Sequence, residues 1–367
     1  MRARDLGIAI GTLPTGPLNT ITDVVGVRVG HTTLIEGEGP LVVGRGPIRT
    51  GVTVILPHEG DPGRDPVFAG SHTLNGNGEM TGLEWVRDSG LLTTPIGVTN
   101  THSVGVVRDA LVAASVARRE GAGLWSLPVV AETWDGYLND VNGQHVRAEH
   151  VFEALDAASG GPIAEGSVGG GTGMKAFGFK AGIGTASRQV GAEHGGYTVG
   201  VLVQANHGRR ERLLIDGVPV GREITRQQIA GPELPAPDAG SIIAVVATDA
   251  PLLPQQCRRL AERPGLGVAR GGGGGENDSG DIFLAFATGN RSLRAEDDEG
   301  APVTFPLNML NDDHISQLFW AAIEATEEAI LNSMIAAETM VGRDGITFHA
   351  LPHDRLVEVM RNYGRLG

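Results

Sequence analysis

The amino-acid sequence predicts an α/β fold, in which buried strands lie against amphipathic helices. Two uninterrupted apolar runs, residues 241–247 and 282–287, are typical of strands that are buried on both faces. Residues 312–337 form a long segment with apolar side chains at helical spacing. This segment begins with Asp312 and Asp313, whose charges stabilise the first turn of a helix. Doubly buried strands beside a long helix indicate the α/β class.

The composition is that of a globular protein with an excess of glycine. The chain of 367 residues exceeds one average domain, although single α/β domains of this size exist. Hydrophobic residues make up 41% and charged residues 20%, which is ordinary for a soluble protein. The 56 glycines are about twice the usual share. They are not periodic, so we expect tight turns and close backbone approaches rather than disorder.

Charge and cysteine content exclude several classes of protein. The net charge of −14 disfavours nucleic acid, because phosphate binding needs a basic surface. No apolar run approaches the ~20 residues that span a bilayer, and the N-terminus lacks the apolar core of a signal peptide. The single cysteine, Cys257, excludes an internal disulfide and fits a reducing compartment. We therefore expect a cytoplasmic protein without nucleic-acid or membrane partners.

The first half of the chain contains two strand patterns and three helical patterns. Residues 24–31 alternate like a half-buried strand, and residues 51–56 read as another. Helical spacing of apolar residues occurs over residues 78–87, 104–119 and 147–158.

A glycine-rich middle section follows. The predicted features are a short apolar segment at residues 129–130, an aromatic loop at 134–137, a non-helical run with eight glycines at 166–184, a strand at 197–205 and a hairpin at 213–220 that turns on Asp216-Gly217. Residues 230–240 contain three prolines and form the clearest linker. Beyond the apolar strand 241–247, Asp249 and Pro251 predict the start of a helix over residues 253–263, and a last helix begins near His353.

Several familiar chemical sites are disfavoured. The loop at residues 169–175 has a lysine but no Gly-Lys-Ser/Thr, and residues 182–187 lack the last glycine of a dinucleotide fingerprint. His145 and His150 are five residues apart, whereas a zinc-protease helix spaces its histidines by four. We expect neither a cofactor nor a catalytic metal. Cys257 reads as a half-buried, inert side chain in a helix. No Gly-x-Ser-x-Gly elbow is present, which disfavours an α/β-hydrolase.

Ser241 starts a buried strand directly after Gly240 and the proline-rich linker. This pattern also fits an ordinary loop-to-strand joint. Chemically, it suits an intramolecular acyl shift, because glycine tolerates backbone conformations that are closed to other residues. Ser241 Oγ can attack the Gly240 carbonyl to form an ester that water hydrolyses. The freed α-amino group, with a reference pKa of about 7.7–8.0, can act as general base for its own hydroxyl.

A second polar cluster, residues 277–281, precedes the buried strand 282–287. It contains Ser279 and Asp281 in a glycine-containing turn, which can be a solvated loop. If this strand lies beside the strand of Ser241, Ser279 and Asp281 can instead relay protons and orient the nucleophile.

Together these segments resemble the family of L-aminopeptidase D-amidase/D-esterases and β-peptidyl aminopeptidases. The resemblance covers nearly the whole chain. Its motifs lie at residues 75–82, 132–140, 169–188, 201–206, 240–243 and 279–281. It implies a four-layer αββα sandwich, similar to N-terminal nucleophile hydrolases but connected differently, in a single domain over residues 1–367. It also implies self-cleavage at Gly240-Ser241 into an α chain (residues 1–240) and a β chain (residues 241–367).

The same resemblance implies a homo-oligomer of αβ units that removes N-terminal residues from short peptides, amides or esters without a cofactor. Residue by residue, the family nucleophile falls on Ser241. The supporting serine and acid fall on Ser279 and Asp281, where a Glu in relatives would reach one methylene further. The oxyanion-hole asparagine falls on Asn206, and the tyrosine that lines the site on Tyr137.

Glu132 is the candidate that binds the substrate ammonium, because an aminopeptidase needs an anion there; the alternative for Glu132 is a surface-turn carboxylate. A serine aminopeptidase is the favoured function. The alternatives are acyl transfer of the ornithine acetyltransferase type, whose nucleophile is threonine, and a non-catalytic scaffold. The sequence leaves open whether the substrate is an L-, D- or β-aminoacyl compound. It also leaves open whether the base is the Ser241 amine or the Ser279/Asp281 pair.

Overall fold

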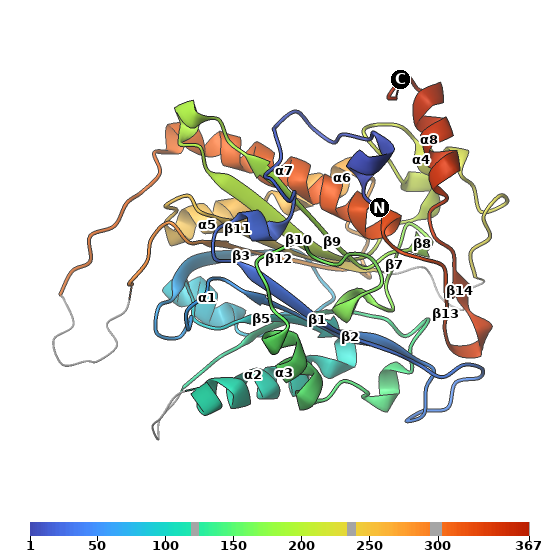
Figure 1. Cartoon of the computed structure of the whole chain (residues 1–367), viewed down its shortest axis with the longest axis horizontal. Helices are drawn as coiled ribbons and strands as arrows, with labels where there is room; N and C mark the ends of the chain where they lie inside the picture. The colour runs from blue at the N-terminus through green and yellow to red at the C-terminus, as the bar shows by residue number, and fades with distance from the viewer. Residues whose placement is uncertain (119–124, 233–239, 294–302, 367) are drawn as a thin grey trace.

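The computed structural model describes residues 1–118, 125–232, 240–293 and 303–366, which fold into four layers (Figure 1). Two β-sheets are stacked face to face, and helices cover the outer face of each sheet. One apolar cluster lies between the sheets, and two others lie between each sheet and its helices. This arrangement is the αββα sandwich that the family resemblance implies.

The smaller sheet forms one inner layer. Its strands are, in spatial order, β1 (Arg28–Glu36), β2 (Ile48–Leu56), β5 (Ile96–Asn100) and β6 (Val129–Thr133). The pairs β1–β2 and β2–β5 are antiparallel, and β5–β6 is parallel. Helices α2 (Val104–Arg118) and α3 (Ala148–Asp156) cover its outer face, where Leu111 and Val151 share an apolar cluster with Val54.

The larger sheet forms the other inner layer. Its strands are, in spatial order, β4 (Leu91–Leu92), β3 (Val67–Gly76), β12 (Gly280–Ala287), β11 (Ser241–Thr248), β10 (Thr198–Asn206) and β9 (Ile183–Gln189). Only β11 and β12 run parallel; every other neighbouring pair in this sheet is antiparallel. Its outer face is covered by α5 (Pro254–Ala261), α6 (Pro264–Arg270) and α7 (Asp312–Ile335).

The uninterrupted apolar run of β11 has a direct physical reason. Alternate side chains of a strand point to opposite faces, and both faces of β11 are covered. Ile243 and Val245 belong to the cluster between the sheets, whereas Ile242 and Ala244 belong to the cluster beneath the helices. Burying one such large apolar side chain contributes about 1.5–3 kcal/mol. The central strands are therefore held firmly, and with them the residues at their ends.

The remaining elements lie at the edges of the sandwich. They are α1 (Leu83–Ser89), β7 (Lys175–Ala176), β8 (Phe179–Lys180), α4 (Val220–Glu223), β13 (Met340–Val341), β14 (Thr347–Phe348) and α8 (His353–Asn362). The predicted helices at 104–119, 147–158, 312–337 and near His353 are confirmed within two residues at the described ends, as are the strands at 197–205, 241–247 and 282–287. Residue 119 and most of the predicted linker, residues 233–239, lie outside the described residues.

Several predicted boundaries are wrong. The strand predicted at 24–31 begins only at Arg28, since the chain is still turning before it, and it runs on to Glu36. The helix predicted at 78–87 begins at Leu83, after Gly82 with its left-handed φ of 72°. The helix predicted after Pro251 begins at Pro254. The turn at Asp216-Gly217 is present, but a single bridge between Ile215 and Val218 replaces a longer hairpin.

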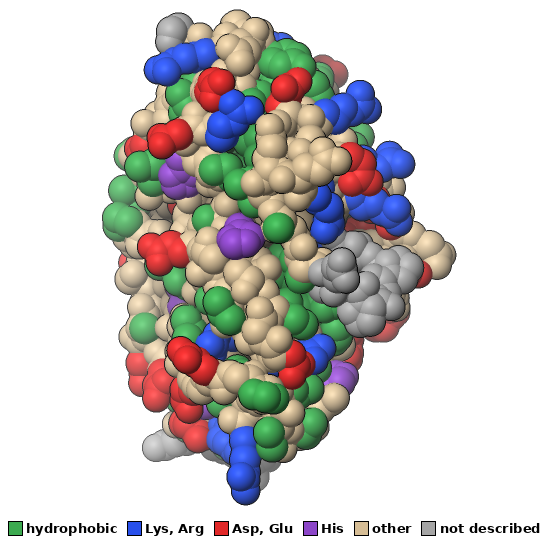
Figure 2. Space-filling view, turned by 90° about the vertical axis from the view of Figure 1, so that its right-hand side faces the viewer, with side chains coloured by type: hydrophobic (Ala, Val, Ile, Leu, Met, Phe, Trp, Pro, Cys, Tyr) green, Lys and Arg blue, Asp and Glu red, His purple; other side chains and the backbone are tan. Residues whose placement is uncertain are grey.

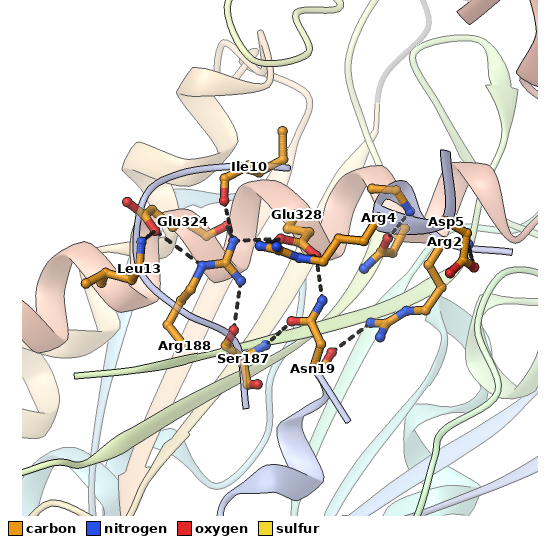
Figure 3. Close-up of polar contacts among 12 residues, drawn as sticks. Arg2, Arg4, Asp5, Ile10, Leu13, Asn19, Ser187, Arg188, Glu324 and Glu328 are labelled. Carbon is orange, nitrogen blue, oxygen red and sulfur yellow. Dashed lines mark hydrogen bonds and ion pairs between the residues drawn. The ribbon is translucent and has the colours of Figure 1, made fainter. Parts of the chain in front are cut away.

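A buried ionic network joins the N-terminal segment and β9 to α7 (Figure 3). Arg188 on β9 is fully buried; its guanidinium donates to Glu328 at 2.6 Å, to Glu324 at 3.2 Å and to the Ile10 carbonyl at 2.6 Å. Arg4 donates to the other oxygen of Glu328 at 3.0 Å. Every charge therefore has a partner, which a buried ion needs. The network ties the N-terminal segment to both α7 and β9.

Replacing Arg188 with Met should lower the free energy of unfolding by about 3–5 kcal/mol, because Glu324 and Glu328 would keep buried charges without their main partner. Urea unfolding monitored by circular dichroism measures this loss. Arg355→Met is the matched control, since Arg355 pairs with Glu358 on the surface, and it should cost less than about 1 kcal/mol. Equal effects of the two substitutions would contradict the importance of the buried network.

Candidate active site

The ends of three adjacent strands bring the predicted site residues together. In the antiparallel pair β10–β11, Asn206 lies opposite Ser241, so the end of β10 meets the start of β11. Strand β12 runs parallel to β11, and Ile242 pairs with Asp281, so Ser279 and Gly280 lie beside Ser241 at the same edge of the sheet. The predicted neighbourhood of Ser241 and the Ser279–Asp281 pair is confirmed in space.

A pocket of about 440 Å³ opens at this edge. It is lined by Asn77, Gly78, Glu79, Thr101, Glu132, Trp134, Tyr137, Asn206, Gly240, Ser241 and Asp278. The charged side chains among these lining residues are all carboxylates. The pocket is therefore suited to a cationic group and to a chain that ends in one.

Ser241 is 8% exposed, and its Oγ accepts a hydrogen bond of 3.0 Å from the Gly280 backbone N–H. This bond orients the hydroxyl at the first residue of β11. The preceding Gly240 approaches β10 so closely that a Cβ there would lie 2.1 Å from the Asn206 carbonyl oxygen and 2.7 Å from His207 Cα. No other residue fits at position 240 without displacing the backbone that carries Asn206. Close approach is thus a sufficient reason for glycine at this position.

Ser279 and Asp281 form a buried hydrogen-bonded pair. Ser279 Oγ donates to Asp281 Oδ1 at 2.6 Å, so the shorter acid reaches the serine directly. The other oxygen, Asp281 Oδ2, is buried and has no hydrogen-bond partner among the residues that the structure describes. Burial raises the pKa of Asp281, although the hydrogen bond from Ser279 opposes the shift. A carboxyl whose pKa is raised in this way can take up a proton more readily than an exposed one.

The carboxamide of Asn206 has a defined orientation. Its Oδ1 accepts the Lys175 backbone N–H at 3.1 Å, and its Nδ2 donates to the Trp134 carbonyl at 2.9 Å. An amide nitrogen carries two hydrogens. One is used by Trp134, and the second is available to an acceptor in the pocket, which Asn206 lines.

Glu132 is a buried strand residue, so the alternative of a surface-turn carboxylate is wrong. It lies on β6 with 4% exposure and accepts hydrogen bonds from the Glu79 N–H at 2.9 Å and from the Thr101 hydroxyl. Burial raises its pKa against the effect of these two bonds.

Tyr137 lines the same pocket and packs edge-on against Trp134, with ring centroids 4.8 Å apart.

Sequence reasoning assigned no role to several residues that line the pocket. Thr101 starts a turn after β5, a strand that was not predicted. Asn77, Gly78 and Glu79 belong to the motif at residues 75–82, which marked the family without suggesting a function. Trp134 was recognised only as part of an aromatic loop. The glycine-flanked asparagine run beside Glu79 is the one sequence signal that could have pointed to residues 77–79, and no local signal pointed to Thr101.

The structure also places the residues of the chemical sites that the sequence disfavoured. Gly169–Gly171 forms a buried turn against β2, where a Cβ on Gly169 would lie 2.3 Å from Thr53 Oγ1. His145 pairs with Asp140 at 2.9 Å. Among the described residues, no group of three His, Cys, Asp or Glu side chains is arranged to hold a metal ion. Cys257 is fully buried rather than half-buried, and burial raises the pKa of its thiol.

The molecular surface and the helices add two observations. On the face shown in Figure 2, Lys and Arg side chains lie among Asp and Glu side chains and form no continuous basic surface. In the part of the chain that the structure describes, no helix is both long and apolar enough to cross a membrane.

Comparisons with known proteins identify close relatives. The model of peptidase family S58 matches residues 19–348. The β-peptidyl aminopeptidase BapA of Sphingosinicella microcystinivorans is 50% identical over 380 residues, which cover 100% of this chain and 93% of the relative. A β-aminopeptidase from a Burkholderia species has a TM-score of 0.91 and 55% identity, covering 99% of both chains.

A further solved structure supports the fold. The L-aminopeptidase D-Ala-esterase/amidase of Ochrobactrum anthropi has a TM-score of 0.90 and 46% identity, covering 100% of this chain and 99% of its own. It is described as a prototype of the serine aminopeptidases and as a new variant among Ntn hydrolase folds. That description agrees with the predicted fold class.

Asp135, between Trp134 and Gly136, should make stability depend on pH. Burial raises its pKa to about 7 from the ordinary 3.8, although Thr50 and Asn139 donate hydrogen bonds to it. Since the folded state keeps this proton longer than the unfolded state, stability falls as the pH rises from about 4 to about 7, by roughly 1.4 kcal/mol per unit.

The test is the thermal midpoint measured between pH 5 and pH 8. Asp135→Asn cannot ionise, so its midpoint should fall less across this range than that of the wild type. Asp156→Asn, an exposed position on α3, should keep the wild-type slope. An unchanged slope for Asp135→Asn would contradict the raised pKa.

Proposed function

The chain belongs to peptidase family S58 and is a peptide-bond hydrolase of the serine aminopeptidase and amidase type, and we propose that Ser241 is both its nucleophile and its new N-terminus. The observation that carries this proposal is the position of Ser241. It starts a buried strand beside Gly280, Ser279 and Asn206, within a pocket that also contains a buried carboxylate. Short peptides, amides and esters are the proposed substrates, as the names of the relatives suggest.

Self-cleavage comes first in the proposed sequence. Ser241 Oγ attacks the Gly240 carbonyl carbon, the peptide C–N bond breaks, and the Oγ proton ends on the Ser241 nitrogen. Water then hydrolyses the ester, which leaves a Gly240 carboxylate and a free Ser241 amine. Before the cut that nitrogen is an amide and has no basic lone pair. The Ser279/Asp281 pair is therefore the better candidate base for the first step, whereas both candidates exist for later turnover.

Hydrolysis then uses the same hydroxyl. Ser241 Oγ attacks the acyl carbon of the substrate, the amine or alcohol leaves, and water releases the acyl group from the serine. The second Nδ2 hydrogen of Asn206 supports an oxyanion role, since its other hydrogen and its oxygen are held by the backbone. A donor of this kind lowers the barrier by ~2.7–4 kcal/mol in comparable sites.

The substrate amine is proposed to pair with Glu132. A buried carboxylate attracts an ammonium strongly, because the local dielectric is low. Glu79 and Asp278 add negative charge nearby, and Trp134 and Tyr137 provide an aromatic wall. These features support a substrate with a free amino end. They leave L-, D- and β-aminoacyl groups as candidates.

Assembly and location complete the proposal. A homo-oligomer of αβ units is supported by the exposed side chains of Phe305, Leu307, Met309 and Trp320, which are 40–53% accessible. A cytoplasmic location is supported by the single, reduced cysteine. None of the relatives described above is named an acyltransferase, and nothing in the pocket favours that reaction over hydrolysis.

Ser241→Ala should leave the chain in one piece, because alanine has no Oγ to attack Gly240. Wild-type protein should give fragments of 240 and 127 residues, and mass spectrometry of the purified proteins measures both outcomes. Ser115→Ala, on the outer helix α2, is the control and should be cut like the wild type. Two fragments from Ser241→Ala would overturn self-cleavage by Ser241.

Glu132→Gln should raise KM for aminoacyl p-nitroanilides at least about tenfold and leave self-cleavage unchanged, since the precursor has no free amine to bind. In the wild type, KM should rise as the pH falls through the raised pKa of Glu132, above the ordinary 4.5. Glutamine cannot ionise, so the KM of the variant should not show this rise at low pH. Glu149→Gln, at an exposed site on α3, is the control. An unchanged KM would remove Glu132 as the amine anchor.

A further inference from the structure

The end of β3 carries the run Asn75-Gly76-Asn77-Gly78, which lies against the loop before β12. The pairing between β3 and β12 shifts at this point: Thr73 pairs with Ile282 and Asn75 with Asp281, so Leu74 is an extra residue. Such a bulge re-aims the side chains that follow it and is common beside active sites. Here it brings the two asparagines to the Ser279 loop.

Both asparagine side chains bind backbone carbonyls of that loop. Asn75 Nδ2 donates to the Glu276 carbonyl, and Asn77 Nδ2 donates to the Asp278 carbonyl at 2.9 Å. The Asn77 backbone N–H adds a third bond, to the Ser279 carbonyl at 3.2 Å. Because a carbonyl can only accept, each position requires a donor. The loop is therefore attached at three of its four residues from 276 to 279.

The attached loop leads directly to the nucleophile. Gly280 follows Ser279, and its N–H is the group that donates to Ser241 Oγ at 3.0 Å. The two backbones are in contact, since a Cβ on Gly280 would lie 2.5 Å from the Asn77 carbonyl oxygen. A shift of the loop would therefore move Gly280, Ser279 and the donor to Ser241 together.

The other end of the run reaches the proposed amine anchor. The Glu79 N–H donates to Glu132, and a Cβ on Gly78 would lie 3.2 Å from Glu132 Oε1 and 3.1 Å from Gly280 Cα. Thus one short segment contacts both the carboxylate and the strand end that supports the nucleophile.

We propose that Asn75 and Asn77 are positioning residues that hold the Ser279–Gly280 loop against Ser241 in both self-cleavage and hydrolysis. The inference rests on the proposed function of Ser241 and adds a role for the asparagine run. Both reactions use the same Oγ, so losing the side-chain bonds should slow them by a similar factor. A displacement of about 1 Å can cost about 100-fold in rate.

The test compares Asn77→Ala, Asn77→Asp and the double variant Asn75→Ala/Asn77→Ala with the wild type. Asn77→Asp keeps the shape but presents oxygens to a carbonyl, so it should be at least as slow as Asn77→Ala. Asn277→Ala is the control, because within the described part of the chain that exposed side chain donates only to Asp278 Oδ1 and to no backbone carbonyl. Asn77 is itself exposed, so the single variants should fold with melting temperatures close to that of the wild type.

The measurements are the half-life of the precursor, by mass spectrometry, and kcat and KM of fully cut protein on an aminoacyl p-nitroanilide. We expect kcat to fall at least tenfold in the double variant, the half-life to lengthen by a similar factor, and KM to change less than threefold. The positioning role would be overturned if the double variant cut itself and hydrolysed substrate at wild-type rates with an unchanged KM. It would also be overturned if only the melting temperature of the variant changed. Either result would leave the proposed function in place. An uncut and inactive wild type would overturn both.

Discussion

The register of three neighbouring strands is the constraint on which the site depends. Antiparallel pairing sets Asn206 opposite Ser241, and parallel pairing sets Asp281 beside Ile242, so the end of one strand and the starts of two others share one sheet edge. A slip of one residue would turn the apolar side chains of β11 from one core to the other. Because both faces of β11 are packed, such a slip would disturb the packing of both cores. The packing therefore holds the register, and the register keeps the Gly280 N–H within hydrogen-bond distance of Ser241 Oγ.

The same architecture explains how the protein can tolerate the proposed cut. Strands β11 and β12 would belong to the β chain, yet they lie inside the larger sheet between β10 and β3 of the α chain. Arg188, which would belong to the α chain, is also paired in a buried network with Glu324 and Glu328, which would belong to the β chain. The two chains would share sheet, core and ion pairs, so cleavage would release the Ser241 amine without releasing the fragment that carries it.

Burial gives the site its electrostatic character. Glu132, Asp135 and Asp281 are each almost fully shielded from water, and burial raises the pKa of each carboxyl. In each case the hydrogen bonds that the carboxyl accepts oppose this shift. Glu132 lines the pocket, whereas Asp281 lies on the strand beside that of Ser241. Buried carboxyls with raised pKa values suit the proposed roles of ammonium binding and proton transfer.

The sequence by itself determined the elements whose pattern is local. Strands β11 and β12 and helix α7 followed from uninterrupted or periodic apolar residues, and the resemblance carried by separated motifs pointed to the fold, to Ser241 and to the residues beside it. Strands β3, β5 and β9 were missed because they mix glycine and polar residues with apolar ones; on β9, Arg188 is buried only because distant glutamates pair with it.

Tertiary structure alone decided the contacts that span the chain. Asn75 and Glu276 are 201 residues apart, and Glu79 and Glu132 are 53 apart, so no local pattern could join them. Their meeting depends on strand register and on a bulge, which are set by the packing of whole sheets rather than by neighbouring residues.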